Sequence, residues 1–288
     1  MSPAEHGVAQ SVRQRLLDRS RDTGEDYNLL LTRYSVERLL YRLSQSEHVD
    51  SFVLKGAMLF TVWKGAMHRP TRDLDLLGFG EASEERLVGV FRSVCDQTVD
   101  DDGMSFDANS VTAAPIRGEH TYAGIRLRIA TQLGSARLNL QVDVGFGDVV
   151  TPEAGTETYP TLLDQPAPRL RMYSPESVIA EKLEAMVSLG MANSRMKDYY
   201  DIWVLLQQFN LDDTVLAAAI RATFDRRRTA IPSSTPLALT DEFAVDPDKQ
   251  RQWFGFLRRS GLPDAHELAT VVKTLRARLL PLLAGQSE

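Results

Sequence analysis

Apolar and polar side chains alternate along residues 136–146, and Asp143 lies at one of the polar positions. A period of two is typical of a strand with one buried face and one polar face. Residues 122–132 alternate in the same way. The two residues between these segments that favour a turn, Gly134 and Ser135, predict that the strands form a hairpin.

Most of the remaining chain has apolar residues every three or four positions, which is the spacing of helices with one buried face. Ser83, followed by two glutamates, is typical of a helix N-cap. Short apolar segments at residues 52–54 and 73–77 lie next to glycines and predict strands. Residues 229–247 contain three prolines and are expected to connect helices. The predicted helices cover residues 11–21, 25–46, 57–63, 84–95, 175–189, 197–209, 213–227, 249–259 and 266–283.

A segment rich in proline, threonine and glycine, residues 147–170, follows all of the predicted strands. Such a change in composition favours a domain boundary. We therefore expect an α+β domain over residues 1–165 and a mainly helical domain over residues 166–288.

Composition excludes several classes of protein. The chain has 288 residues, of which 43% are hydrophobic and 25% are charged, as in an ordinary globular protein. Its one cysteine, Cys95, rules out an internal disulfide framework and argues against a cysteine-based zinc site. Because we find no membrane segment and no secretory signal, we expect a cytoplasmic protein.

Charge is distributed unevenly along the chain. Residues 1–165 hold 17 Lys and Arg against 24 Asp and Glu, whereas residues 166–288 hold 16 against 15. Basic clusters occur in the second part at Arg226–Arg228 and at Arg258–Arg259. Each cluster is either a solvated helix face or part of a track for a polyanion.

Asp73 and Asp75 are candidates for a metal site. Residues two apart in a strand project from the same face, about 6.5–7 Å apart. Two such carboxylates repel one another unless they face water or hold cations, and Mg²⁺ takes carboxylate and phosphate oxygens together. Asp143 would add a third carboxylate from a neighbouring strand. The alternative is a solvated strand end.

Other residues could contact phosphate. Lys55 and Gly56 connect a predicted strand to a helix, where backbone N–H groups can approach an anion, although the same residues suit an ordinary turn. Arg69 and Arg72 precede the aspartate pair and could neutralise either a triphosphate or the carboxylates. Lys182 lies beside the apolar stripe of its helix, so it either extends along that surface to water or binds a triphosphate.

Two more carboxylates, Asp198 and Asp201, lie one helical turn apart near the start of a predicted helix. Acidic residues at this place also stabilise the helix dipole, and that alternative explains Asp198 better than Asp201.

The order of these features resembles the AbiEii-type toxins, including the mycobacterial MenT group, within the nucleotidyltransferase superfamily. The resemblance covers about half of the chain. One departure is the Lys-Gly-Ala of residues 55–57, where many nucleotidyltransferases have Gly-Gly or Gly-Ser. The segments that carry it are Leu-Lys-Gly-Ala-Met-Leu-Phe at 54–60, Arg-Pro-Thr-Arg-Asp-Leu-Asp-Leu at 69–76, Glu-Lys-Leu-Glu-Ala at 181–185 and Arg-Met-Lys-Asp-Tyr-Tyr-Asp at 195–201.

This resemblance implies a mixed sheet with flanking helices and a Mg²⁺-dependent transfer of nucleotide from a nucleoside triphosphate, CTP or another pyrimidine nucleotide being favoured. The implied acceptor is the 3′ end of tRNA, whose modification blocks aminoacylation and translation. Asp73 and Asp75 would hold Mg²⁺ and Lys182 would bind the triphosphate. Asp198, with Asp201 as second choice, would be the further acidic residue of the site.

The resemblance also implies a cognate antitoxin encoded alongside and, in some relatives, silencing by phosphorylation at the position of Thr71. The basic clusters would then line a track for RNA. We expect a monomer. Two other functions remain open: transfer to a protein hydroxyl or a small molecule, and a non-catalytic module that binds nucleotide or RNA.

Overall fold

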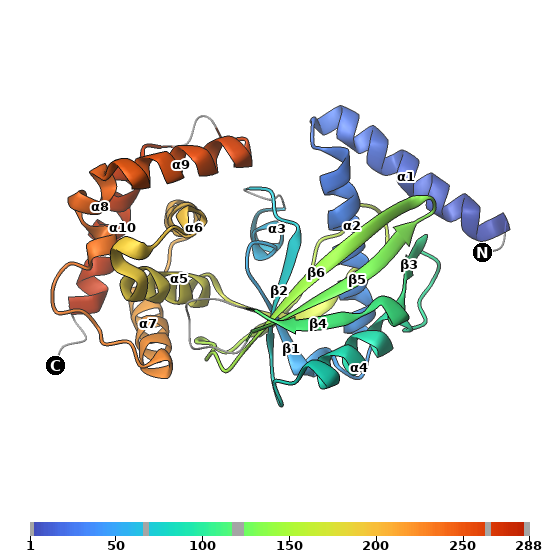
Figure 1. Cartoon of the computed structure of the whole chain (residues 1–288), viewed down its shortest axis with the longest axis horizontal. Coiled ribbons are helices and arrows are strands. Elements are labelled where there is room, and N and C mark those ends of the chain that lie inside the picture. Colours follow the sequence, from blue (N-terminus) through green and yellow to red (C-terminus); the bar gives the residue numbers. More distant parts are fainter. Residues whose placement is uncertain (1–2, 66–68, 117–123, 263–265, 285–288) are drawn as a thin grey trace. The chain divides into compact units, whose positions relative to one another are not determined.

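The computed structural model describes residues 3–65, 69–116, 124–262 and 266–284 (Figure 1). The chain divides into two compact units. The first consists of Met1–Gly147 and Gly155–Met172, and the second of Asp148–Ala154 and Tyr173–Glu288. Residues 166–172 therefore lie in the first unit, beyond the boundary that the sequence suggests after residue 165, because residues 169–172 form a strand of its sheet.

The first unit is built on an eight-stranded mixed sheet with the order β3-β5-β6-β2-β1-β8-β7, and β4 pairs with β5 outside this path. β2 runs antiparallel to β1 and parallel to β6, while β8 runs parallel to β1. The expected α+β fold with a mixed sheet is confirmed. The strands are β1 (Phe52–Lys55), β2 (Asp73–Gly78), β3 (Met104–Phe106), β4 (Thr112–Pro115), β5 (Gly124–Leu133), β6 (Ala136–Phe146), β7 (Gly155–Thr158) and β8 (Arg169–Met172).

The hairpin expected at Gly134 and Ser135 is confirmed, since Leu133 pairs directly with Ala136 across a two-residue turn. The first two residues of the expected strand at 122–132 lie outside the described residues. β3, β4, β7 and β8 have no counterpart in the pattern-based prediction. They are short, with three or four residues each, so the alternation that reveals a strand has too few positions to register.

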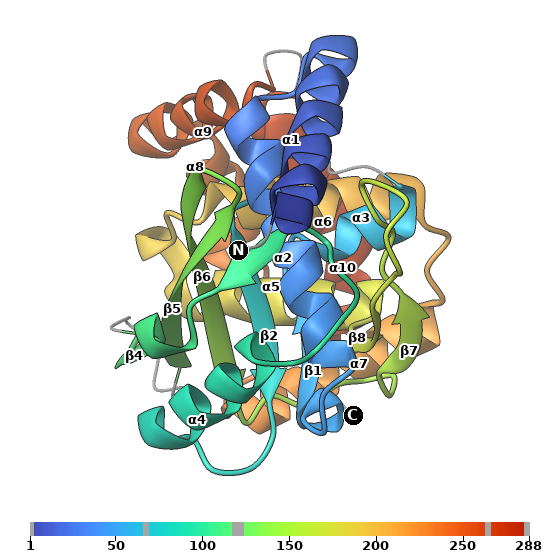
Figure 2. The same ribbon diagram turned by 90° about the vertical axis from the view of Figure 1, so that its right-hand side faces the viewer.

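Helices α1 (Pro3–Thr23), α2 (Tyr27–Ser44), α3 (Leu59–Lys64) and α4 (Glu84–Cys95) complete the first unit. α2 contacts β6 and β8, and α4 contacts β4 and β5 (Figure 2). The ring of Phe52 in β1 packs edge-on against Phe91 in α4 at 5.7 Å between ring centroids. The apolar positions of the strands therefore turn towards these helices, and the alternating polar positions occupy the other face of the sheet.

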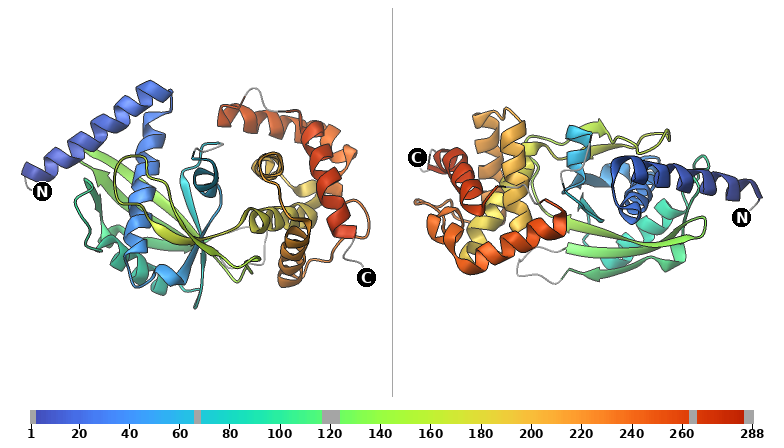
Figure 3. Two further views of the ribbon diagram at one scale, coloured as in Figure 1. Left: turned by 180° about the vertical axis from the view of Figure 1, so that it is seen from behind. Right: turned by 90° about the horizontal axis from the view of Figure 1, so that it is seen from above.

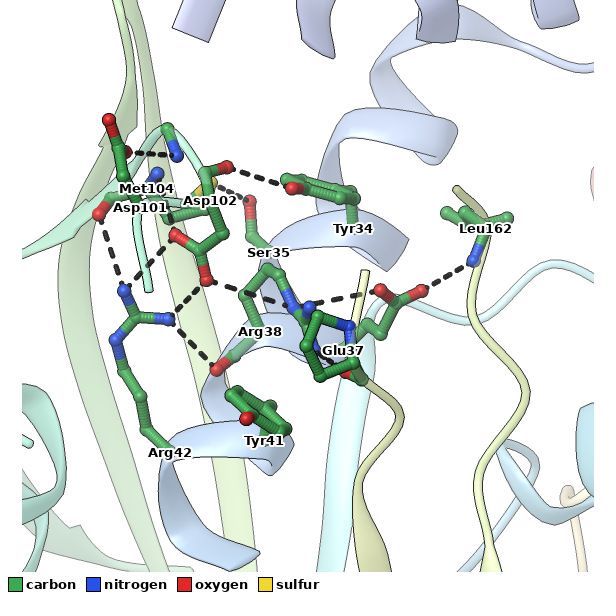
Figure 4. Close-up of polar contacts among 12 residues, drawn as sticks. Tyr34, Ser35, Glu37, Arg38, Tyr41, Arg42, Asp101, Asp102, Met104 and Leu162 are labelled. Atoms are coloured by element: carbon green, nitrogen blue, oxygen red, sulfur yellow. Dashed lines mark hydrogen bonds and ion pairs between the residues drawn. The ribbon is translucent and has the colours of Figure 1, made fainter. Parts of the chain in front are cut away.

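A buried network of charged groups fastens α2 to the chain before β3 (Figure 4). Arg42 donates two hydrogen bonds to the carboxylate of Asp102, at 2.7 and 3.1 Å, and Tyr34 donates to the Asp102 backbone carbonyl at 2.8 Å. Arg38, fully buried, donates to the carbonyl of Pro166 at 2.7 Å. These bonds satisfy charges that would be costly to bury alone.

Glu37 extends from α2 in the other direction. It is 1% exposed and its Oε2 accepts a hydrogen bond from the Leu162 backbone at 2.7 Å, while its Oε1 has no hydrogen-bond partner. Burial raises the pKa of this carboxyl to about 7, against the opposing effect of the Leu162 amide and of the Arg38 and Arg33 charges. Glu37 is thus protonated in the folded protein at a pH where it ionises in the unfolded chain.

The second unit is helical, as the sequence predicts, and Figure 3 shows its helices from two further directions. Within the residues described here, Tyr199 donates to the carbonyl of Ala238 at 2.9 Å and Trp253 donates to that of His266 at 3.0 Å. The segment at 229–247, which its three prolines predict to be a connector, contains a short helix. The helices are α5 (Pro175–Leu189), α6 (Met196–Gln208), α7 (Asp213–Arg227), α8 (Asp241–Val245), α9 (Pro247–Ser260) and α10 (Leu268–Ala284).

None of the helices in the described residues is both long enough and apolar enough to cross a membrane.

Replacing Glu37 by Gln tests its ionisation. An acid whose folded pKa is about 7 against an ordinary 4.5 loses stability as the pH rises between those values, here by roughly 3 kcal/mol. We expect the free energy of unfolding of Glu37→Gln, measured in urea, to exceed that of the wild type at pH 7.5 but not at pH 4.5. Glu47→Gln, at an exposed glutamate, should follow the wild type at both pH values. An equal effect of Glu37→Gln at the two pH values would contradict the raised pKa.

Candidate functional site

A row of four charged residues crosses the polar face of the first unit's sheet. Lys55 in β1 stands opposite Asp75 in β2, which stands opposite Asp143 in β6, which stands opposite Arg126 in β5. Residues in register on neighbouring strands project from the same face. The row therefore runs from a cation, through two carboxylates, to a second cation.

Arg126 and Asp143 form the tightest pair of this row. The Arg126 guanidinium donates to both carboxylate oxygens of Asp143, at 2.8 and 2.7 Å. This bond, with the charges of Asp143, Asp73 and Asp75, raises the pKa of Arg126 above its ordinary value. The sequence alone gives no sign that Arg126 belongs to this row. Its partner could have been found from the two-residue hairpin turn, which places residue 126 opposite residue 143.

Gly56 brings the turn after β1 against Asp75. Its φ is +79°, and a Cβ at this position would lie 2.2 Å from the Asp75 Oδ2. Only glycine fits here, because any side chain would collide with the carboxylate and the backbone conformation is strained for other residues. The carboxylate of Asp75 is consequently confined between the turn and the Asp143 strand.

Asp73 lies two residues before Asp75 on the same face of β2, and it is exposed whereas Asp75 is half-buried. Mg²⁺ in phosphate-transfer sites is held by one or two carboxylates, and substrate phosphates and water complete its shell. The oxygens of Asp73 and Asp75 therefore suit Mg²⁺ chemically. The described residues contain no group of three or more acidic, His or Cys side chains arranged to hold a metal ion. The third ligand that the sequence suggests, Asp143, has both oxygens bonded to Arg126 instead.

The residues just before β2 stand at the edge of this face. Arg69 and Thr71 are half-buried, and Arg72 is exposed. The Lys55 side chain extends from β1 towards β6. Its Nζ lies 3.5 Å from the position that a Cβ on Gly145 would occupy. The first unit thus places one lysine and two arginines near the aspartate pair in sequence or in register.

The second unit holds a separate cluster around Lys182 in α5. The Lys182 ammonium contacts Asp198 Oδ1 at 2.5 Å and Asp201 Oδ2 at 2.9 Å, and both aspartates, from α6, are 0% exposed. Arg195 adds a contact to Asp198 Oδ2 at 2.7 Å. Burial alone would raise the pKa of Asp198, but the charges of Lys182, Arg195 and Lys197 outweigh it, and the pKa lies below its ordinary value.

The cluster gives Lys182 two partners that the sequence alone does not suggest. Its side chain does not simply extend along an apolar surface, because two buried carboxylates fix the ammonium at a position that is 13% exposed. Asp198 and Asp201 contact the same ammonium, so the geometry gives both of them a part in placing Lys182.

The basic cluster at 226–228 is only partly a surface feature. Arg227 turns inward and donates to Glu184 at 2.7 Å and to Asp148 at 2.9 Å, while Thr229 donates to the other oxygen of Glu184 at 2.6 Å. The Arg227 side chain is 13% exposed. The RNA contact expected for Arg226–Arg228 therefore does not suit Arg227, whose charge is used within the unit. Arg226 is exposed, and Arg228 ends α7 in the left-handed conformation.

Arg258 and Arg259 behave differently. Both are exposed in the last turn of α9.

Cys95 is buried at the end of α4, and burial raises the pKa of its thiol to about 12, so it is inert at neutral pH.

Two solved structures share the fold. The JHP933 protein of Helicobacter pylori is 14% identical, covers 89% of this chain and 95% of its own, and has a TM-score of 0.52. A second Helicobacter pylori protein, described as a nucleotidyltransferase, is 15% identical, covers 90% of this chain and 99% of its own, and has a TM-score of 0.51. No curated protein sequence matches the chain.

The family model for the nucleotidyl transferase AbiEii toxin of type IV toxin–antitoxin systems matches residues 38–274. This match covers most of the chain and includes both the strand aspartates and the Lys182 cluster. The chain belongs to the AbiEii nucleotidyl transferase toxin family, and membership implies a cognate antitoxin.

Replacing Gly56 by Ala tests the confinement of Asp75. We expect a loss in the free energy of unfolding of about 1 kcal/mol from the positive φ, and about 1–3 kcal/mol more from the collision with the carboxylate. Gly65→Ala is the matched control, because Gly65 has a φ of +71° with nothing within 4 Å of its Cβ position. Equal losses in the free energy of unfolding for the two variants, measured in urea, would show that the Asp75 side chain moves aside without cost.

Replacing Lys182 by Met leaves the two buried carboxylates without their shared cation. We expect a loss of about 3–5 kcal/mol in the free energy of unfolding. Adding Asp201→Asn should restore part of this loss, because one carboxylate then no longer needs a counter-charge. Lys197→Met, at an exposed lysine nearby, should stay within about 0.5 kcal/mol of the wild type. A Lys182→Met protein as stable as wild type would contradict the cluster.

Proposed function

We propose that this protein is a Mg²⁺-dependent nucleotidyltransferase toxin that transfers nucleotide from a nucleoside triphosphate to the 3′ acceptor end of tRNA. The observation that carries the proposal is the pair Asp73 and Asp75 on one face of β2, with Asp75 held against the Gly56 turn, in a chain of the AbiEii family. Two carboxylates on one face of a strand repel one another, and a bound cation relieves this repulsion.

In this proposal Asp73 and Asp75 would hold Mg²⁺, which would supply positive charge to phosphate oxygens and to the attacking hydroxyl. The RNA 3′-hydroxyl oxygen would form a bond to the α-phosphorus and lose its proton to water. The bond from the α-phosphorus to the bridging oxygen would break, and pyrophosphate would leave with that electron pair. Arg126 keeps Asp143 neutralised, so the aspartate pair presents its charge without a third carboxylate beside it.

Cationic side chains bind the triphosphate. Lys55, Arg69 and Arg72 are those next to the aspartate pair in sequence or in register, and the resemblance implies the same role for Lys182. Charge on the leaving pyrophosphate increases during the reaction, so cations at this end stabilise the transition state more than the bound substrate. Asp198 and Asp201 act through Lys182 as positioning residues, because both contact its ammonium.

tRNA as the acceptor and a pyrimidine nucleotide as the donor follow from the resemblance to the MenT-like toxins. Thr71 is half-buried two residues before Asp73. A phosphate on its hydroxyl would add negative charge beside the aspartate pair and would oppose triphosphate binding. We propose this as the site at which the toxin is silenced.

The test is a labelling assay with purified protein, total tRNA, Mg²⁺ and each α-³²P-labelled nucleoside triphosphate in turn. We expect label on tRNA with at least one nucleotide. Asp73→Asn and Asp75→Asn should each lower the rate at least about 100-fold, because each removes half of the carboxylate charge that holds the cation. Chelation by EDTA should abolish the label.

Glu157→Gln is the matched control, since this exposed carboxylate lies in β7 of the same sheet but away from the charged row. It should label tRNA at the wild-type rate. Label on protein instead of tRNA would favour transfer to a protein hydroxyl. No label with any of the four nucleotides, together with a growth defect that survives Asp73→Asn, would favour the non-catalytic alternative.

A further inference from the structure

An open groove of about 690 Å³ lies within the second unit, lined by the first turn of α6 and by α9. Its volume falls in the range of ligand sites, roughly 300–1,000 Å³. The α6 side contributes Arg195 and Lys197, and the α9 side contributes Arg251 and Arg259. One carboxylate, Asp248, also lines it and pairs with Arg251. Arg195 is paired with Asp198, so the groove keeps a net positive charge from Lys197 and Arg259.

α9 is divided sharply into two faces. Trp253, Phe256 and Leu257 are buried in the unit. Phe254 lies at the border of this buried face and is 60% exposed, although it is a large apolar side chain. It lies three residues after Arg251 and four before Arg258, so it stands between two arginines on one helical stripe.

This stripe continues the charge of the groove along the helix. From Arg251 to Arg258 is seven residues, or about 10 Å along the axis. Arg259 joins the two features, because its Nη1 lies 3.2 Å from where a Cβ on Gly255 would be. The guanidinium thus lies over the bare backbone of α9, at the border between the groove and the stripe.

From this arrangement we infer that α9 and the first turn of α6 form a docking site for single-stranded RNA, with Phe254 as the surface on which an unpaired base stacks. The inference rests on the proposed function, which requires an RNA end as acceptor. Grooves that bind single strands combine cations along the backbone with exposed aromatic rings for the bases. Arg258 and Arg259, rather than Arg227, then carry the RNA contact in this unit.

Two other ligands share part of this chemistry. A nucleoside triphosphate concentrates its charge at one end of a single nucleotide, whereas the cations here are spread along two elements and about 10 Å of helix. An acidic protein would pair with the arginines but would leave the exposed ring of Phe254 without a specific role. A polynucleotide uses both the repeated charges and the ring.

The test measures binding separately from catalysis. The fluorescence anisotropy of a fluorescein-labelled 12-nucleotide single-stranded RNA reports RNA binding by the full-length protein over a series of KCl concentrations. A fluorescent nucleoside triphosphate reports nucleotide binding. Arg258→Gln/Arg259→Gln should weaken RNA binding at least about tenfold at low salt. It should also reduce the slope of log K against log [KCl] by about 1.4, since each phosphate contact to a single strand contributes about 0.7.

Phe254→Ala should weaken RNA binding at least about fivefold with little change in the salt slope, because stacking does not release counterions. Phe254→Trp should retain the affinity. The matched control is Arg221→Gln/Lys273→Gln, which removes the same charge from exposed positions of α7 and α10 in the same unit. This control should keep the wild-type affinity and slope, and nucleotide binding should be unchanged in all of these variants.

RNA binding by the Arg258/Arg259 and Phe254→Ala variants equal to that of the control would overturn the inference. So would a loss of nucleotide binding in place of RNA binding. The two proposals fail separately. If the wild type binds RNA through α9 but labels no tRNA, the transfer reaction is wrong and the docking site stands. If the α9 variants label tRNA with an unchanged KM for tRNA, the docking site is wrong and the reaction stands.

Discussion

The position of β2 between β1 and β6 is the constraint on which the candidate site depends. Because β2 is antiparallel to one neighbour and parallel to the other, a single register on each side places Lys55, Asp75 and Asp143 in one row. The hydrophobic residues at alternate positions hold β2 against the helices, and they cannot move to the other face without exposing the core. The carboxylates are therefore kept near one another by the burial of their apolar neighbours, despite their mutual repulsion.

The second unit also holds carboxylates close together, but there they are buried and paired with cations. Asp198 and Asp201 are fully buried around Lys182, and Glu184 and Asp148 surround Arg227. Removing one member of such a cluster leaves an uncompensated charge, so loss of activity in a Lys182 variant combines chemistry with folding. A stability measurement must therefore accompany any assignment of Lys182 to catalysis.

Much of this architecture could be predicted from the sequence. The long strand at 136–146, the hairpin turn and the capped helix at 84–95 agree with the structure because each has enough residues for a clear period or a specific cap. The short strands and α8 could not be predicted from the sequence, because pairing and packing with distant segments stabilise them. The aspartate pair and Lys182 were singled out from their spacing and from the order of the motifs, and their roles stay predictions. The partners of these residues were not, since Arg126 and Arg195 resemble any other exposed arginine until the strand register and the helix contacts are known.

The two-residue turn between β5 and β6 also limits how the chain can change over evolution. Its length decides which residue of β5 faces Asp143, and one residue more or fewer would turn Arg126 to the apolar side and a buried residue to the polar side. Substitutions at Gly134 and Ser135 change the strain of the turn and the hydrogen bond that Ser135 accepts from Arg13. An insertion or deletion instead changes the charge pairing of residues 126 and 143, eight residues away on either strand. Homologous chains are therefore expected to drift in the identity of these residues while keeping their number.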